Sequence, residues 1–250
     1  MQWGENVVGW GCMKKILGKI FVMGACALGM LGVPAQGQDM SADELLAAMR
    51  EMTVSQGNKD VQGSIRKGGN KVPFSLSARG ETIVFQYKQG NAWHRFDVRI
   101  NAKNVDLIRV VKGKAQVLAP KNYATPIAGT DVCYEDLSLR FLYWKGGKLV
   151  DDPANSRVKG RDCYIVEVKN PTPNVGQFGW VRMWVDKENG TTWQIDGHGL
   201  DGKLKKRFTI TSVQKLDDGG WFFKQMKLEV KDPKNPSNNI SVNYMDMQDI

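Results

Sequence analysis

IVFQYKQGNAWHRFDVRI, residues 83–100, is the stretch that decides the fold class of this 250-residue chain. Apolar and polar side chains alternate on both sides of its central Gln89-Gly90-Asn91 segment. This pattern is typical of two half-buried strands joined by a turn. So short a connection allows antiparallel strands and excludes parallel ones. The stretch therefore predicts a β-hairpin with one buried face.

The same pattern recurs along the rest of the chain. Further strand-like runs occupy residues 106–111, 163–168, 180–185, 191–195, 204–216, 221–230 and 240–245. Gly-rich turns separate neighbouring runs, as at Glu188-Asn189-Gly190 and Asp217-Asp218-Gly219-Gly220. The sequence therefore predicts one antiparallel meander of about nine to eleven strands.

Two helical segments interrupt the β pattern. Ser41 and Glu44 have the spacing of a capping box, and apolar residues recur at helical spacing over residues 42–52. In the middle of the chain, apolar residues at helical spacing predict a short helix over 134–144 that ends at Gly146-Gly147. The predicted fold class is therefore α+β, a curved antiparallel sheet with an N-terminal helix and a short central helix covering one face.

The first 37 residues indicate export. Three lysines between residues 14 and 19 follow Met13, residues 20–33 carry no charge, and Ala35-Gln36-Gly37 supplies small residues before Gln38. A permanent membrane helix would need roughly 20 apolar residues, so a cleaved signal peptide over 13–37 is the stronger interpretation. Residues 1–12 look unlike a leader, and we interpret them as a mis-annotated extension upstream of Met13.

An alternative fate for this end of the chain is lipidation at Cys26. Cys26 follows Met23-Gly24-Ala25, which resembles a lipobox, but the apolar run continues beyond it. A lipid-anchored form is therefore the weaker interpretation. Residues 38–250 have a length that is usual for one β-rich domain, and we predict a single exported domain.

Cys133 and Cys163 would remain after cleavage. An even pair of cysteines in an oxidising compartment predicts a disulfide. It would close a loop of about 30 residues and stabilise the fold by about 3.6 kcal/mol. A reactive or metal-binding pair is the alternative, but the two histidines, His94 and His198, are too few for a zinc site.

The chain is basic, with a formal net charge of +9. Its densest basic cluster is Lys203, Lys205, Lys206 and Arg207, which an exposed strand explains without nucleic acid. A positive surface would favour anionic lipid headgroups, although a solvated face that maintains solubility is the simpler interpretation.

Catalytic motifs are not found in the sequence. It contains no G-x-S-x-G, no H-E-x-x-H and no P-loop. On a helix the adjacent Glu135 and Asp136 would point about 100° apart, so they are poorly placed to share a substrate. Asp136 is more simply a cap or a dipole partner near the N-terminus of the central helix. We therefore expect neither an enzyme nor a cofactor, although loops distant in sequence could still assemble a site.

Several segments resemble the LolA-like outer-membrane lipoprotein-sorting proteins. The most specific is Tyr134-Glu135-Asp136-Leu137-Ser138, and further pieces are the segments 158–164 and 184–187 and Asp201-Gly202-Lys203 with Trp221. The resemblance extends over residues 41–250 and is to a less characterised branch of the family. It implies a half-open β-barrel with helices as a lid over its concave face, and a hydrophobic cavity for acyl chains.

The resemblance also implies a function and partners. Such a periplasmic carrier would bind lipoprotein or lipid acyl chains, meet inner- and outer-membrane sorting proteins, bind no nucleic acid and act as a monomer. Strand alternation and helical spacing give the candidate cavity and lid residues, for which core packing is the competing interpretation: Leu45, Met49, Ile83, Phe85, Tyr87, Leu137, Phe141, Val181, Met183 and Val185. Two other functions remain open, a sensor or interaction module that binds an envelope protein and an enzyme acting on an envelope substrate.

Overall fold

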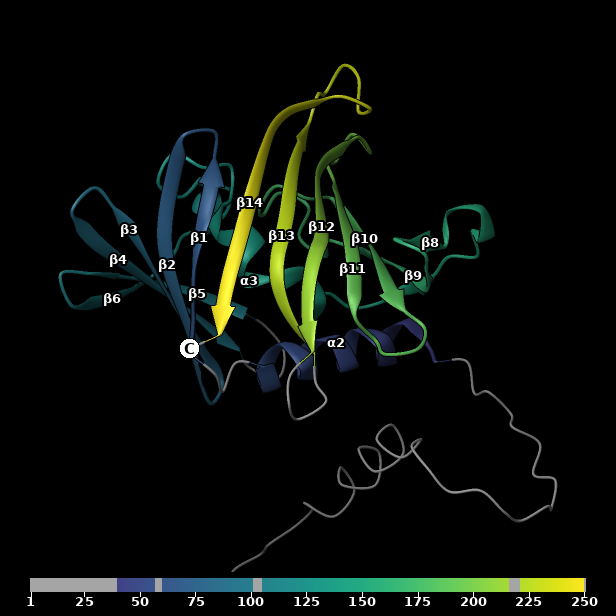
Figure 1. The fold of residues 1–250 in the computed structure, drawn as a ribbon, viewed down its shortest axis with the longest axis horizontal. Helices are drawn as coiled ribbons and strands as arrows, with labels where there is room; N and C mark the ends of the chain where they lie inside the picture. The colour runs from purple at the N-terminus through teal and green to yellow at the C-terminus, as the bar shows by residue number, and fades with distance from the viewer. Residues whose placement is uncertain (1–39, 57–59, 101–104, 216–220, 250) are drawn as a thin grey trace, which may run out of the picture. The chain divides into compact units, whose positions relative to one another are not determined.

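The computed structural model describes residues 40–249 apart from 57–59, 101–104 and 216–220 (Figure 1). The proposed extension, the signal peptide and Cys26 lie outside the described residues. Among the helices that are described, none combines the length and the apolar character needed to cross a bilayer.

The N-terminal helix forms where the sequence predicts it. Helix α2 (Ala42–Gln56) begins after Ser41, whose backbone N–H donates to the Glu44 carboxylate at 2.8 Å. The Glu44 N–H donates in return to the Ser41 hydroxyl at 3.3 Å, which completes the capping box. Leu45, Leu46 and Met49 are buried on one side of the helix. The prediction of an amphipathic helix here is confirmed.

Within the described residues, fourteen strands form the antiparallel sheet. They are β1 (Val61–Lys67), β2 (Asn70–Arg79), β3 (Thr82–Gln89), β4 (Ala92–Ile100), β5 (Val105–Val111), β6 (Lys114–Val117), β7 (Lys148–Leu149), β8 (Arg157–Val158), β9 (Arg161–Lys169), β10 (Trp180–Asp186), β11 (Thr192–His198), β12 (Leu204–Lys215), β13 (Trp221–Lys231) and β14 (Asn239–Asp249). The predicted number of strands was too low. Strands β1 and β2 were missed because Gly63 and Pro73 interrupt the usual strand pattern. Strands β6, β7 and β8 are too short to show alternation.

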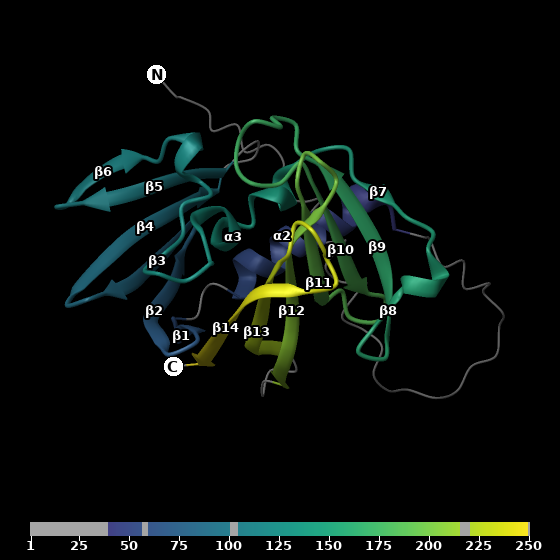
Figure 2. The same ribbon diagram turned by 90° about the horizontal axis from the view of Figure 1, so that it is seen from above.

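The strand order leaves the sheet open. It runs β6-β5-β4-β3-β2-β1-β14-β13-β12-β11-β10-β9-β7, with β8 paired to β9, so β6 and β7 are not joined to each other. The first and last long strands meet in the middle, where Ile65 of β1 lies opposite Met245 of β14. Figure 2 shows the sheet curving around α2 and the short helix α3 (Tyr134–Ser138). The predicted class of a curved, half-open antiparallel sheet with two helices is therefore confirmed.

The main core lies on the concave face of the sheet. Its largest fully buried side chains include Phe85, Phe96, Phe141, Leu46 and Ile65, which come from both the sheet and the helical segments. A second, smaller cluster of Cys163, Ile165 and Trp184 lies on the other face of β9 and β10. Both faces of the sheet are therefore apolar at β9 and β10, because the segment 148–158 covers the convex face there.

The central helical segment is broken in two. Helix α3 ends at Leu139, which has a left-handed backbone with φ of 47°, and the 3-10 helix η2 (Arg140–Tyr143) follows. Two further 3-10 turns, η1 (Pro120–Asn122) and η3 (Pro153–Asn155), lie in the connections on either side. The prediction of one continuous helix over 134–144 was wrong. Apolar spacing cannot distinguish an α-helix from an α-helix and a 3-10 turn that bury the same face.

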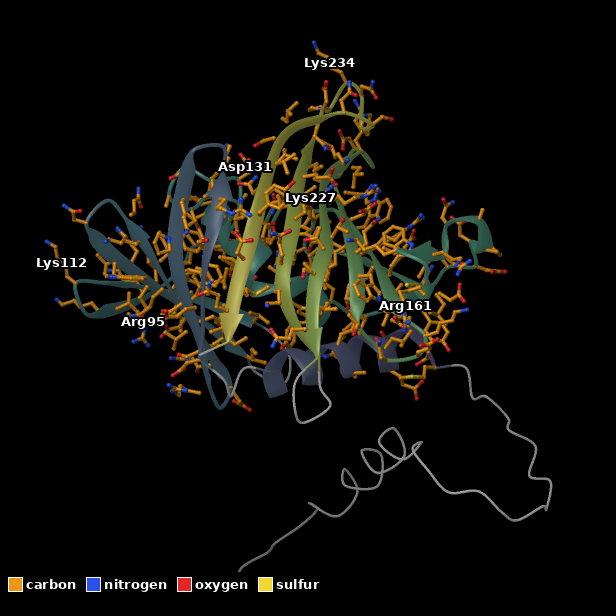
Figure 3. All side chains as sticks on the ribbon, in the orientation of Figure 1. Arg95, Lys112, Asp131, Arg161, Lys227 and Lys234 are labelled. Carbon is orange, nitrogen blue, oxygen red and sulfur yellow. The ribbon has the colours of Figure 1, made fainter. Side chains whose placement is uncertain are left out.

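A row of alternating charges crosses the convex face. Directly opposite residues of six strands form this charge row: Lys148, Glu167, Arg182, Asp196, Arg207 and Glu229. Arg182 donates to Glu167 at 2.8 Å, and Arg207 donates to the two Asp196 oxygens at 2.8 and 2.6 Å. Figure 3 shows Lys227 on the same outer face, and its ammonium lies 3.2 Å from Glu229. The predicted exposed basic cluster needs one correction, because Lys206 is 8% exposed and belongs to the concave side.

Acid is expected to destabilise the fold below pH 6.5 through His198. Its ring stacks on Trp180 with centroids 3.6 Å apart, and its Nδ1–H donates to the Gly202 carbonyl at 3.1 Å. Burial disfavours the charged ring and lowers the pKa of His198 below its usual 6.5. Because the unfolded chain binds the proton more readily, this stabilisation is complete above pH 6.5 and is lost as the pH falls through the folded-state pKa.

The matched variant for this prediction is His198→Phe, which keeps a ring on Trp180 and removes the titration. The free energy of unfolding, measured with urea from about pH 7 to about pH 5, should fall more steeply in the parent than in the variant. Carboxylates such as Asp246, whose pKa is lowered by its hydrogen bonds to Arg66, titrate below 3.8 and do not enter this window. Equal slopes in the two proteins would show that another group is responsible.

Candidate functional site

An apolar cavity of about 240 Å³ lies between the helical segments and the concave face of the sheet. Six residues contribute its helical wall: Met49, Asp136, Leu137, Leu139, Phe141 and Leu142. Six of the residues in its sheet wall come from β3 and β11–β14: Ile83, Ile195, Phe208, Ile210, Met226 and Met245. Strand register explains this wall, since Ile210 lies opposite Met226 and Met226 lies opposite Met245. Directly opposite residues share one face of a sheet.

The candidate residues from the sequence divide into two groups. Met49, Ile83, Leu137 and Phe141 line the cavity. Leu45, Phe85, Tyr87, Val181, Met183 and Val185 face the same concave side but are buried in the main core. Alternation identifies the face of each strand, but it cannot show over which strands the helices leave a gap. A role of any of these residues in binding a ligand remains a prediction.

Several cavity residues were not anticipated. Phe208, Ile210, Met226 and Met245 lie in runs that the sequence predicts as strands, and their alternation was visible there. Their position over the gap depends on the pairing of β1 with β14, which brings the two ends of the meander together. Such a long-range pairing has no local signal.

The central helix α3 is anchored to the sheet through Asp136. Lys206 of β12 approaches its carboxylate at 2.6 Å, and the Gln177 side-chain amide donates to it at 2.6 Å. The Cys133 backbone N–H donates to the same carboxylate at 2.9 Å, so Asp136 is the N3 residue of a capping box whose N-cap residue is Cys133. The Lys206 ammonium donates in addition to the Asp131 carbonyl oxygen at 2.8 Å. Both charges of this buried pair are therefore neutralised and hydrogen-bonded.

A second buried ion pair holds the start of η2. The Glu135 side chain is fully buried, and it accepts hydrogen bonds from Arg140 at 2.8 Å and from the Gln177 backbone N–H at 2.6 Å. Burial raises the pKa of Glu135, although both donors favour its ionised form. Arg140 also donates to the Val175 carbonyl at 3.1 Å. We call the Asp136–Lys206 and Glu135–Arg140 pairs together the anchor of α3.

Helix α2 is held by contacts with the segment 142–147, which follows the anchor in the chain. Arg50 of α2 donates to the Leu142 carbonyl at 2.7 Å, and its guanidinium lies over the Tyr143 ring. Near the other end of α2, the Gly147 N–H donates to Asp43 at 3.2 Å. We call α2 and residues 141–143 of η2 together the lid, since Arg140 belongs to the anchor. Leu139, with its left-handed backbone, lies between the lid and the anchored α3.

The predicted disulfide is wrong, because both cysteines are free in the structure. Cys133 lies beside α3 on the concave side, where its sulfur accepts a hydrogen bond from Gln177 at 2.9 Å. Cys163 belongs to the small cluster on the convex face. A disulfide requires side chains that point toward each other at short range, which opposite faces of a sheet prevent. Burial raises the pKa of both thiols, that of Cys163 to about 11.

The titratable side chains of the described residues offer little for chemistry. No group of three or more His, Cys, Asp or Glu side chains is placed there to hold a metal ion. The His94 ring stacks on Tyr87 and the His198 ring on Trp180. The arrangement supports sequestration of an apolar ligand better than bond cleavage.

Comparison with known proteins agrees with the predicted fold. A family model with the description "Uncharacterized protein" matches residues 112–249. No curated protein matches the sequence.

Three solved structures have the same fold over most of the chain. A DUF1329 family protein from Desulfovibrio piger is 17% identical with a TM-score of 0.63, and the match covers 83% of this chain and 90% of that one. A putative outer membrane lipoprotein-sorting protein domain from Vibrio parahaemolyticus is 15% identical (TM-score 0.62), with coverage of 83% and 92%. A LolA superfamily protein from Nitrosomonas europaea is 12% identical (TM-score 0.60), with coverage of 84% and 92%.

Proposed function

Because the chain belongs to the family whose model matches residues 112–249 and has the fold of LolA superfamily proteins, we propose that it carries the acyl chains of lipids or lipoproteins in its cavity. The observation that carries this proposal is the apolar hollow between the lid and β11–β14. The carrier would be exported by the segment 13–37, act in the periplasm and exchange its ligand with sorting proteins of the inner and outer membranes. It makes and breaks no covalent bond.

The size of the cavity defines what loading requires. Pockets for drug-sized ligands measure roughly 300–1,000 Å³, so a cavity of about 240 Å³ must widen to hold long or multiple acyl chains. Under the proposal, the lid of α2 and residues 141–143 moves while the anchor keeps α3 and Arg140 in place on the sheet. Met49, Met226, Met245 and Met247 in the walls would adapt to the ligand, since the unbranched methionine side chain fills irregular spaces.

The energetics of acyl-chain burial require a carrier to balance affinity against release. Each methylene group buried in an apolar cavity contributes about 0.8 kcal/mol. A short stretch of acyl chain therefore suffices for useful affinity, whereas deeper burial would slow release. Movement of the lid offers a way to balance the two.

The direct test is native mass spectrometry of the mature protein purified from the periplasm of its own host, followed by lipid extraction. Retention of a lipid or an acylated peptide at near one-to-one ratio would support the proposal and identify the ligand class. A protein that is isolated empty and that also fails to take up a fluorescent fatty acid would refute it.

Met226→Asp is expected to weaken fatty-acid uptake at least tenfold. The substitution places a carboxylate in the middle of the sheet wall, where an acyl chain would have to bury it without a partner. Uptake is measured by titration with a fluorescent fatty acid, and each tenfold loss corresponds to about 1.4 kcal/mol.

The control is Ser212→Asp, which introduces the same carboxylate at an exposed position of the neighbouring strand β12. Its uptake should equal that of the parent. Met226→Trp fills the same space with apolar atoms and should also reduce uptake without introducing a charge. Full uptake by folded Met226→Asp and Met226→Trp would show that the acyl chain binds elsewhere.

A further inference from the structure

A second hollow lies on the opposite, convex face of the sheet and has a volume of about 670 Å³. It extends over β1–β3, β14 and the start of β4. Ser64, Pro73 and Ser75 lie in it, and their small side chains leave space between the longer side chains around them. We call this hollow the outer groove. It shares none of its residues with the apolar cavity.

A row of polar side chains crosses the outer groove. Gln248, Gln62, Ser75 and Gln86 lie directly opposite one another on four successive strands. With a strand spacing of about 4.8 Å, the row spans about 14 Å. The groove is therefore suited to an extended ligand rather than to a single small ring.

These side chains have unused hydrogen-bonding capacity. Ser75 donates to the Gln86 side-chain oxygen at 3.3 Å, which leaves the Gln86 amide hydrogens available. Gln62 and Gln248 make no side-chain hydrogen bond within the described residues. A side-chain amide offers two donors and an acceptor, which matches a ligand whose hydroxyl groups both donate and accept.

Trp93 stands at the rim of the outer groove and is 56% exposed. An exposed tryptophan beside a polar groove provides a flat apolar surface next to hydrogen-bonding groups. The ring of a pyranose sugar has the complementary character, with C–H groups on its faces and hydroxyl groups at its edge.

The charges in the groove favour a neutral ligand. The Asp246 carboxylate is already occupied by Arg66 at 2.5 and 3.1 Å and by Gln225 at 2.8 Å. Lys71 is the remaining charged residue of the lining. A single lysine beside a neutralised carboxylate is a poor site for a polyanion such as nucleic acid, which requires several cations.

We propose that the outer groove binds a neutral linear oligosaccharide. Trp93 stacks on one sugar ring, and the row of glutamine amides binds hydroxyl or acetamido groups along the chain. A peptide is the other extended polar ligand to consider. It is disfavoured because the row of polar side chains on four successive strands matches repeated hydroxyl groups better than the alternating side chains of an extended peptide.

The test is calorimetric titration of the full domain with chitotriose, cellotriose and a polar hexapeptide, each at up to about 10 mM. We expect saturable binding of at least one sugar and no binding of the peptide. Trp93→Ala should weaken sugar binding about tenfold, and Trp93→Phe, which keeps an aromatic face, should retain most of it. Trp180→Ala, which removes a tryptophan from another strand of the convex face, should leave it unchanged.

The proposed oligosaccharide site and the proposed carrier function can be tested separately. Trp93→Ala should take up fluorescent fatty acid as the parent does, because Trp93 is not in the apolar cavity. Absence of sugar binding, sugar binding that Trp93→Ala leaves intact, or binding of the peptide alone would each overturn the proposed oligosaccharide site.

Discussion

Gly176→Ala is expected to destabilise the protein by about 4 kcal/mol or more. Gly176 has a φ of +85°, which costs other residues roughly 1–3 kcal/mol. A Cβ atom would lie 2.1 Å from the Glu135 Oε1 atom, so the buried carboxylate would have to leave its place. That displacement disturbs the ion pair with Arg140, and breaking a buried pair costs about 3–5 kcal/mol.

The matched control is Gly202→Ala. Gly202 also has a positive φ, of +75°, but a Cβ atom there would meet nothing within 4 Å. Its loss of stability should be limited to the backbone strain of roughly 1–3 kcal/mol. Both free energies of unfolding are measured by urea denaturation. If the free energy of unfolding fell by the same amount in the two variants, the clash with Glu135 would make no contribution to the loss of stability.

Lys206→Met is expected to destabilise the protein by about 3–5 kcal/mol. Burial alone would lower the pKa of Lys206, but Asp136 together with Cys133 and Asp131 outweighs burial and raises the pKa, so the side chain stays charged. Removing the ammonium leaves the Asp136 carboxylate, whose side chain is 1% exposed, without its counter-ion. An uncompensated buried charge is the costly product, more than the loss of the attraction itself.

Two comparisons isolate this effect. Asp136→Asn combined with Lys206→Met removes both charges and should cost less than the sum of the single variants. Arg157→Met breaks the exposed pair with Asp162, whose side chains are 66% and 68% exposed, and should cost less than about 1 kcal/mol. Equal losses for Lys206→Met and Arg157→Met in urea denaturation would contradict the role of the anchor.

The sequence predicts the fold well wherever the signal is local. The hairpin of residues 83–100, the capping box at Ser41 and the runs that form β9–β14 all carry the periodicity of their element. Strands β1 and β2 contain a glycine and a proline, and their membership in the sheet depends on pairing with each other and with β14. The break at Leu139 likewise depends on the anchor that fixes α3.

In the candidate site, too, the sequence predicted the features that have a local signal and missed those that depend on long-range contacts. Glu135 and Asp136 were predicted to be poorly placed to share a substrate, but their role as an anchor was not predicted. Their partners explain why: Gln177 lies 41 residues from Asp136, and Lys206 lies 70 residues from it. No local pattern links residues so far apart. The cavity residues could be assigned to a face by alternation, whereas the gap above that face exists only once the helical segments are placed.

The charge row on the convex face has a consequence for the accuracy of folding. A slip of β11 by one residue would turn Asp196 toward the apolar concave side, and a slip by two would place it opposite Trp180 or Trp184 instead of Arg182. Each misaligned pairing leaves unpaired ions along the row, so the correct alignment is separated from its competitors by several charge contacts at once. The ion pairs on the convex face thus help to fix the strand register of the concave face. The register that pairs these ions also brings Ile195, Phe208 and Ile210 to the cavity wall.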